Sequence, residues 1–303
     1  MLRSAALIAS TMLAIGLAGC TAPAPDPASD GVLRIVASTN VYGDLAQTIA
    51  GPDAEVTSIV DDPSQDPHEF EANGRVQLAM SRADIVIVNG GGYDDFATAM
   101  LTASGNTGAR LIDAVELSGL DASADGFNEH VWYDAFAMEK VVEALALAVG
   151  SVDAAAADDA AAAAVQLRIG LSKLESTADE ANALIEAGHL GVIITEPVPL
   201  YLLMNLGFEN LTPPEFSEAI EEDADVPPAL LQSVLNLLGD GSAALVVYNE
   251  QTGGPQTDAV IDVATDNHIP AIGVTETLPE GLHYLGWQSR ILDSIISASG
   301  IYG

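Results

Sequence analysis

A long segment without strand signals divides this chain and limits its fold more than any other feature. Residues 151–188 are rich in alanine, the most helix-favouring residue, and contain one interior glycine, Gly170. Apolar positions recur along it at Val165, Leu167, Leu171, Leu174 and Leu184. At about 1.5 Å of rise per residue, a continuous helix here is as long as a whole domain. We therefore predict one long helix, or two abutting helices, forming a spine between two lobes.

Short strand patterns alternate with helical patterns on both sides of this segment. They cover residues 33–38, 55–60, 84–89 and 110–113 before it, and residues 191–195, 209–211, 244–248 and 271–274 after it. Strands that alternate with helices form parallel βαβ units, so the predicted fold class is α/β. We expect two similar lobes with central parallel sheets, residues 32–150 and 190–303, joined by a long rigid helix at residues 151–189.

Two stretches rich in glycine or proline interrupt this pattern. Three glycines at residues 90–92 follow a strand pattern, but they lack the Lys-Ser/Thr of a phosphate loop and the spacing of a dinucleotide fingerprint. We interpret them as a sharp strand-to-helix turn. Residues 212–228 have proline pairs near both ends and five acidic residues within residues 218–225, and we predict a loop there.

The N-terminus has the pattern of a processed export signal. Arg3 gives a positive start, residues 5–17 are apolar, and Leu-Ala-Gly precedes Cys20, the single cysteine. We interpret residues 1–20 as a lipoprotein signal peptide and Cys20 as the lipidated residue; an ordinary cleaved signal peptide is the alternative. Residues 21–31, rich in proline and alanine, predict a flexible tether. The expected location is the extracytoplasmic face of the cell membrane, with attachment through the lipid anchor.

The charge of the chain limits its partners. It has 44 acidic and 9 basic residues, a formal net charge of -35. Nucleic acid binding needs Lys and Arg for the phosphates, so we expect no nucleic acid partner. An acidic surface concentrates cations near the protein, although adaptation to salt explains the same composition. A single cysteine excludes an intrachain disulfide and a multi-thiolate metal site. We expect a monomer.

Two of the five histidines lie in loop-like, polar surroundings. His68, in the sequence Asp-Pro-His-Glu-Phe, follows the strand at residues 55–60, and His130 lies in Asn-Glu-His-Val-Trp-Tyr-Asp. His189 lies at a helix-to-strand junction, where a cation favours the helix dipole. We interpret His268, at a strand entry, as structural, and we leave the role of His283 open.

Positions at strand ends add two carboxylates. Glu196 directly follows residues 191–195, and Glu276 comes two residues after the last strand. In open α/β sheets, ligands bind beyond the carboxyl ends of the strands, so these carboxylates, with His68 and His130, predict a metal site in the cleft between lobes. The alternative is that Glu196 and Glu276 are ordinary acidic residues in the first turn of a helix, where the helix dipole also favours them. Glu250 is a rival carboxylate, or a residue that supports the ligands.

Together these features resemble the metal-specific solute-binding lipoproteins of bacterial ABC transporters, the zinc/manganese type. The matching stretches are residues 35–45, 66–70, 83–91, 128–134, 195–207, 248–251 and 272–278. The resemblance implies one divalent metal ion bound between two lobes, delivery to a membrane permease, and no enzymatic activity. By this resemblance, His68 and His130 match the family's two metal ligands from the first lobe. Glu196 matches a position where the family has His or Glu, and Glu276 matches a position where the family usually has Asp.

The identity of the metal stays open between Mn(II) and Zn(II). Two imidazoles and two carboxylates favour Mn(II) slightly, although Zn(II) generally binds such sites more tightly. Affinity should fall below about pH 6.5, because ligand imidazoles must be neutral. The histidine-rich insertion often seen in zinc-binding members is missing after His68. The acidic residues 218–225 lie elsewhere and contain no histidine, so they are a poor substitute for that insertion. A secreted zinc-dependent hydrolase and a metal-free surface adhesin are the alternatives from other functional classes.

Overall fold

The computed structural model describes residues 31–62, 70 and 73–301. Leu33–Gly303 forms one compact unit, separate from Met1–Val32. The predicted signal peptide with Cys20, most of the predicted tether, and His68 lie outside the described residues. Among the described helices, none is long and apolar enough to cross a membrane.

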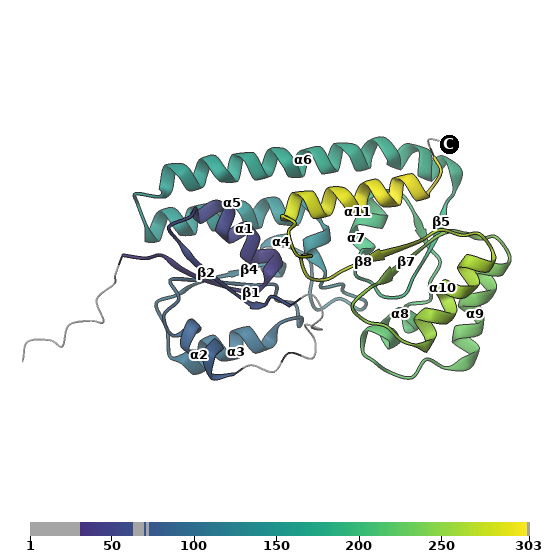
Figure 1. Ribbon diagram of the computed structural model, residues 1–303, viewed down its shortest axis with the longest axis horizontal. Helices are drawn as coiled ribbons and strands as arrows, with labels where there is room; N and C mark the ends of the chain where they lie inside the picture. The colour runs from purple at the N-terminus through teal and green to yellow at the C-terminus, as the bar shows by residue number, and fades with distance from the viewer. Residues whose placement is uncertain (1–30, 63–69, 71–72, 302–303) are drawn as a thin grey trace, which may run out of the picture. The chain divides into compact units, whose positions relative to one another are not determined.

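The first half of the compact unit contains a parallel sheet with the strand order β2-β1-β3-β4 (Figure 1). Its strands are β1 (Arg34–Thr39), β2 (Glu55–Val60), β3 (Ile85–Val88) and β4 (Arg110–Asp113). Successive side chains of β1 and β3 point to opposite faces, so each strand contributes to two cores. Ile35 and Ile85 belong to the large core, and Val36 and Val86 to a smaller one.

Helices cover both faces of this sheet. Helices α1 (Asn40–Ala50), α4 (Ala114–Ser118) and α5 (Ala135–Val152) contribute to the large core, whereas α2 (Gly74–Met80) and α3 (Asp95–Ser104) contribute to the smaller one. The three glycines before α3 all have positive φ angles, and a Cβ on Gly90 would lie 2.2 Å from Asp113 Oδ1. The predicted sharp turn is therefore confirmed, since a larger residue would both strain the backbone and clash.

The second half repeats the arrangement with the order β6-β5-β7-β8, again all parallel. Its strands are β5 (Gly191–Ile194), β6 (Glu209–Asn210), β7 (Ala243–Asn249) and β8 (Ala271–Val274). Its helices are α7 (Leu200–Asn205), α8 (Pro214–Glu221), α9 (Pro228–Gly239), α10 (Pro255–Asp266) and α11 (Tyr284–Ala298). The predicted α/β class with two parallel sheets is confirmed.

Helix α6 (Ala157–Gly188) is the predicted long helix, and it is continuous over 32 residues. It lies along α5 and α11 (Figure 1). Its inner side chains, Leu171 among them, belong to the large core that is shared by both sheets. Gly170 lets α11 approach closely, because a Cβ there would lie 2.3 Å from Leu285 Cδ1. The one interior glycine of this helix is therefore a packing contact with α11.

One local prediction is wrong. Residues 212–228 are not simply a loop, because α8 occupies Pro214–Glu221 within them and α9 begins at Pro228. Pro214 and Pro228 are each the first residue of a helix, where proline's missing N–H and fixed φ angle are well tolerated. The prolines therefore start helices here, and α8 brings the acidic residues to a new position.

Candidate metal centre

Three of the four predicted ligands lie within the described residues, and they converge at the carboxyl ends of the strands. Glu196 follows the last residue of β5 by two positions, and Glu276 follows the last residue of β8 by two. Asn249 is the last residue of β7, the strand between β5 and β8. His130 directly precedes the short 3₁₀ helix Val131–Tyr133. The fold thus places an imidazole from the first half of the chain beside carboxylates from the second.

The imidazole of His130 is fully buried and held in one orientation. Its Nδ1 lies 2.6 Å from Asn128 Oδ1. Asn128 Nδ2 in turn donates to the carbonyl of Pro197 at 3.0 Å. This contact fixes the orientation of the Asn128 amide, so that its Oδ1 is the atom that faces His130. Since Asn128 Oδ1 also accepts from the His130 backbone N–H, the proton of the neutral ring belongs on Nδ1. Nε2 is then the lone-pair nitrogen, the arrangement that histidine metal ligands use.

Asn249 joins the two carboxylates through one amide nitrogen. Its Nδ2 donates to Glu196 Oε2 and to Glu276 Oε1, both at 2.8 Å. Glu196 and Glu276 are each 1% exposed, so both carboxylates are almost completely removed from water. Because Asn249 lies on the strand between theirs, its side chain reaches both sides without any unusual loop.

Other donors position these carboxylates further. The Tyr93 hydroxyl donates to Glu276 Oε2 at 3.0 Å, and the Thr252 hydroxyl donates to Glu196. Burial, and then the charge of Glu276, raise the pKa of Tyr93, which keeps the phenol protonated as a donor. The same Glu276 oxygen lies 4.0 Å from His130 Nε2. Two buried carboxylates side by side are unfavourable without a compensating cation, so their pairing beside the imidazole points to a cation as the missing partner.

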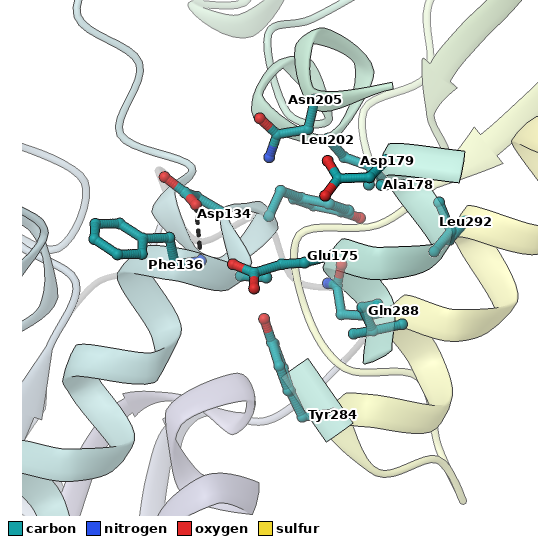
Figure 2. Close-up of a pocket in the computed structure, with 13 residues that line it drawn as sticks. Asp134, Phe136, Glu175, Ala178, Asp179, Leu202, Asn205, Tyr284, Gln288 and Leu292 are labelled. Carbon is teal, nitrogen blue, oxygen red and sulfur yellow. Dashed lines mark hydrogen bonds between the residues drawn. The ribbon is translucent and has the colours of Figure 1, made fainter. Parts of the chain in front are cut away.

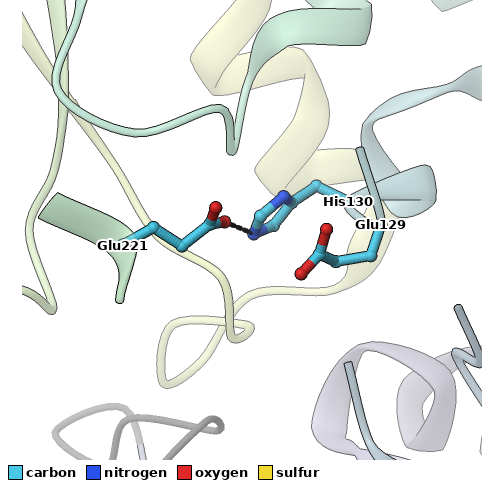
Figure 3. Close-up of side chains that lie close together, drawn as sticks. All are labelled: Glu129, His130 and Glu221. Atoms are coloured by element: carbon cyan, nitrogen blue, oxygen red, sulfur yellow. Dashed lines mark ion pairs between the residues drawn. The ribbon is translucent and has the colours of Figure 1, made fainter. Parts of the chain in front are cut away.

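A further carboxylate, from α8, approaches the same imidazole. Glu221 Oε1 lies 3.5 Å from His130 Nε2, and its side chain is 13% exposed (Figure 3). Glu129, His130 and Glu221 each offer one ligand atom, all within 4.8 Å of one another. Burial, and then the charges of the surrounding glutamates, raise the pKa of Glu221 to about 9. The acidic residues 218–225, which were not among the predicted ligands, therefore bring a carboxylate next to the predicted site.

The remaining predicted residues lie away from this cluster or outside the description. His68 is among the residues that the structure does not describe. Glu250 is exposed, and its carboxylate lies over Gly273, where a Cβ would approach Glu250 Oε1 to 2.2 Å. Asn249 donates to both carboxylates of the site, whereas Glu250, the residue after β7, lies against Gly273 instead.

The other three histidines have local roles. His189 and His268 both adopt left-handed backbone conformations, with φ angles of 50° and 59°, and His189 is the C-cap of α6. His283 precedes α11, and its Nδ1 lies 2.6 Å from Asp44 Oδ1 on α1. That hydrogen bond, and the charge of Asp44, raise the pKa of His283. The role that the sequence left open for His283 is thus a contact between two helices.

Two cavities lie near these elements. One, of about 440 Å³, is formed by residues of α6, α7 and α11 and by the start of α5, with Glu175, Asp179 and Tyr284 among its lining residues (Figure 2). His130, Glu196 and Glu276, the predicted ligands that the structure describes, do not line it, so this cavity is separate from them. The other, of about 300 Å³, is lined by polar residues that include Glu221, Gln251 and Thr252. This second cavity adjoins the metal centre through Glu221.

The sequence matches a known family over nearly its whole compact unit. Residues 35–298 match the family described as ZnuA, zinc-uptake complex component A, periplasmic. The chain belongs to this family. Its members are solute-binding proteins of ABC transporters and not enzymes, which removes the hydrolase alternative.

Relatives and solved structures agree with this assignment. The manganese-binding lipoprotein MntA of Halalkalibacterium halodurans is 25% identical over 305 residues, covering 94% of this chain and 95% of that protein. The SBP FpvC of Pseudomonas aeruginosa, solved in complex with Mn²⁺, gives a TM-score of 0.73 at 21% identity, over 90% of this chain and 100% of that one. A Cd-bound periplasmic metal binding protein of Candidatus Liberibacter asiaticus gives 0.67 at 18% identity, over 88% and 99%. The two structures establish the shared fold.

Proposed function

We propose that this protein binds one divalent transition metal ion, Mn(II) or Zn(II), and delivers it to the membrane permease of an ABC transporter. The observation that supports this most directly is the pair of buried carboxylates, Glu196 and Glu276, held by one Asn249 amide beside His130. A cation bound there offsets the repulsion between the carboxylates. The relatives that bind manganese support the same class of cargo.

The proposed ligands are His68, His130, Glu196 and Glu276. His130 offers Nε2, and the carboxylates supply hard oxygen donors, which suit Mn(II) better than a site of imidazoles alone. Carboxylates that bind through both oxygens raise the coordination number above the tetrahedral four that structural Zn(II) sites prefer. We infer Mn(II) as the physiological cargo and Zn(II) as the principal competitor. Glu250, which is exposed, lies outside this set.

The proposed location is the extracytoplasmic face of the cell membrane, with attachment through a lipid on Cys20. The lobes at residues 32–150 and 190–303 then enclose the ion as a monomer, and residues 21–31 act as the tether. Helix α6, which contacts both α1 and α11, restricts lobe movement to small rocking. The permease is expected to pull the lobes apart and release the ion.

Metal binding by purified protein tests this function. Metal-stripped wild-type protein is titrated with Mn²⁺ and Zn²⁺ against a chromophoric chelator, alongside Glu196→Ala and Glu276→Ala. Both variants should lose at least tenfold in affinity. The matched control is Glu250→Ala, which removes an exposed carboxylate from the neighbouring strand end and should bind like the wild type. Equal affinity in all four proteins would refute the proposed site.

A further inference from the structure

We propose that Glu221 is an additional metal ligand, supplied by α8, that makes this site richer in oxygen donors than His130, Glu196 and Glu276 alone. The inference rests on the proposed function, because it concerns the same metal ion. Its first support is position: Glu221 Oε1 lies 3.5 Å from His130 Nε2, the ring nitrogen on the side opposite the Nδ1 that contacts Asn128 (Figure 3). An ion bound to that nitrogen is within reach of the carboxylate after only a small side-chain rotation.

The second support is the way in which α8 holds Glu221. The helix begins at Pro214, and Phe216 anchors it with a fully buried ring in the core of the second sheet. Glu221 is the last residue of this helix, so a fixed helix and not a long loop delivers its carboxylate. A helix C-terminus bears partial negative charge, which makes it a poor place for a buried carboxylate unless a cation is nearby. A bound divalent ion supplies that cation.

The third support is the polar environment behind the carboxylate. Glu221 lines the cavity of about 300 Å³ together with Gln251, Thr252 and Thr257. Thr252 also donates its hydroxyl to Glu196, so the cavity adjoins two of the carboxylates of the site. The hydroxyl of Thr257 is buried and has no hydrogen-bond partner among the described residues. A cavity with such groups has the size and polarity to hold water. An ion bound by Glu221 therefore has space to retain water ligands.

Together these features predict a preference for one metal. Glu196, Glu221 and Glu276 add three carboxylates to the imidazole of His130. Hard oxygen donors and retained water suit the octahedral coordination of Mn(II), whereas Zn(II) is satisfied by four ligands. Loss of Glu221 should then weaken Mn(II) binding more than Zn(II) binding. Glu221 is in this sense a residue that determines specificity.

The test compares Glu221→Gln with Glu222→Gln. Glu222 is the next residue, is exposed, and loses the same charge on substitution. By competition titration, Glu221→Gln should weaken Mn²⁺ binding by about 10–100-fold, the range for groups that support or form metal sites, and Zn²⁺ binding by less. Glu222→Gln should stay within twofold of the wild type. Equal Mn²⁺ affinity of the two variants would overturn the inference.

A second variant separates direct ligation from charge alone. Glu221→Asp keeps the charge but withdraws the carboxylate by one methylene. If Glu221 binds the metal directly, this variant should bind Mn²⁺ more weakly than the wild type. Mn²⁺ affinity equal to that of the wild type would show that only the charge matters and would refute direct ligation. Glu276→Gln, measured in parallel, separates this inference from the function itself. If Glu276→Gln loses affinity and Glu221→Gln does not, only the role of Glu221 is wrong. If neither loses affinity, the metal centre itself is wrongly placed.

Discussion

Replacing Asn249 with alanine probes how the site is organised, because this residue binds no metal in our account. Its Nδ2 donates to Glu196 and Glu276 at 2.8 Å each, and its side chain is 2% exposed. Asn249→Ala removes both hydrogen bonds and leaves the two carboxylates without the amide that holds them together. The substitution therefore disturbs the geometry of the carboxylates and leaves the proposed ligands in place.

The expected size of the effect follows from these two contacts. A hydrogen bond to a charged group contributes about 1.5–3 kcal/mol, and loss of a group that orients metal ligands typically lowers affinity by about 10–100-fold. A tenfold change corresponds to about 1.4 kcal/mol, so the loss of Mn²⁺ affinity should be about 1.4–2.8 kcal/mol. The metal-free protein should also lose stability, because the buried carboxylates repel each other more strongly without a shared donor.

Competition titration with Mn²⁺, together with thermal unfolding of the metal-free and metal-loaded protein, measures both effects. Asn236→Ala is the matched control, since Asn236 is exposed on α9 and its side-chain oxygen accepts a hydrogen bond from Gln232. The control should change neither quantity. If Asn249→Ala folds and binds Mn²⁺ within twofold of the wild type, Asn249 does not organise the carboxylates and our reading of this pocket is wrong.

Three further predictions concern single side chains. Tyr93→Phe removes the donor to Glu276 Oε2 and should weaken Mn²⁺ binding by about tenfold in the same titration; unchanged affinity would exclude this contact. Glu175→Gln should raise the unfolding temperature at pH 7, because the raised pKa of Glu175 means that the fold disfavours its ionised form. The difference should vanish at acidic pH, where Glu175 is protonated in both the folded and the unfolded protein. His283→Ala should lower the stability of the fold at pH 6 but not at pH 9. The raised pKa of His283 stabilises the fold below about pH 6.5, and this contribution disappears as the pH rises through the folded-state pKa. Equal losses at both pH values would show that the contact between Asp44 and His283 is not linked to protonation.

Much of the architecture was predictable from local sequence patterns. The alternation of strand and helix signals predicted two parallel sheets, and the alanine-rich stretch predicted α6. The start of α6 was predicted too early, at residue 151, because α5 continues to Val152 and the alanines at residues 154–156 form the turn before Ala157. Helix α8 was missed because prolines at both ends of its segment look like loop signals, although proline is also common at the first helical position.

The candidate site was predictable only in part, for two different reasons. Glu196 and Glu276 follow strands directly, and the rule that ligands bind beyond carboxyl ends of strands was enough to select them. Asn249 was not selected, because the predicted strand at residues 244–248 ends before it, whereas β7 extends to Asn249. Glu221 had no local signal, because its approach to His130 depends on how α8 packs, and nothing local in the sequence specifies that packing.

Anomalous X-ray diffraction from crystals grown with Mn²⁺ tests the central claim most directly, because it locates the ion without reference to any mutation. We predict one anomalous peak within coordination distance of His130 Nε2 and of carboxylate oxygens from Glu196 and Glu276. A peak in the cavity beside Glu175, a peak elsewhere on the acidic surface, or no ordered peak in metal-saturated crystals would contradict our account of where this protein holds its cargo.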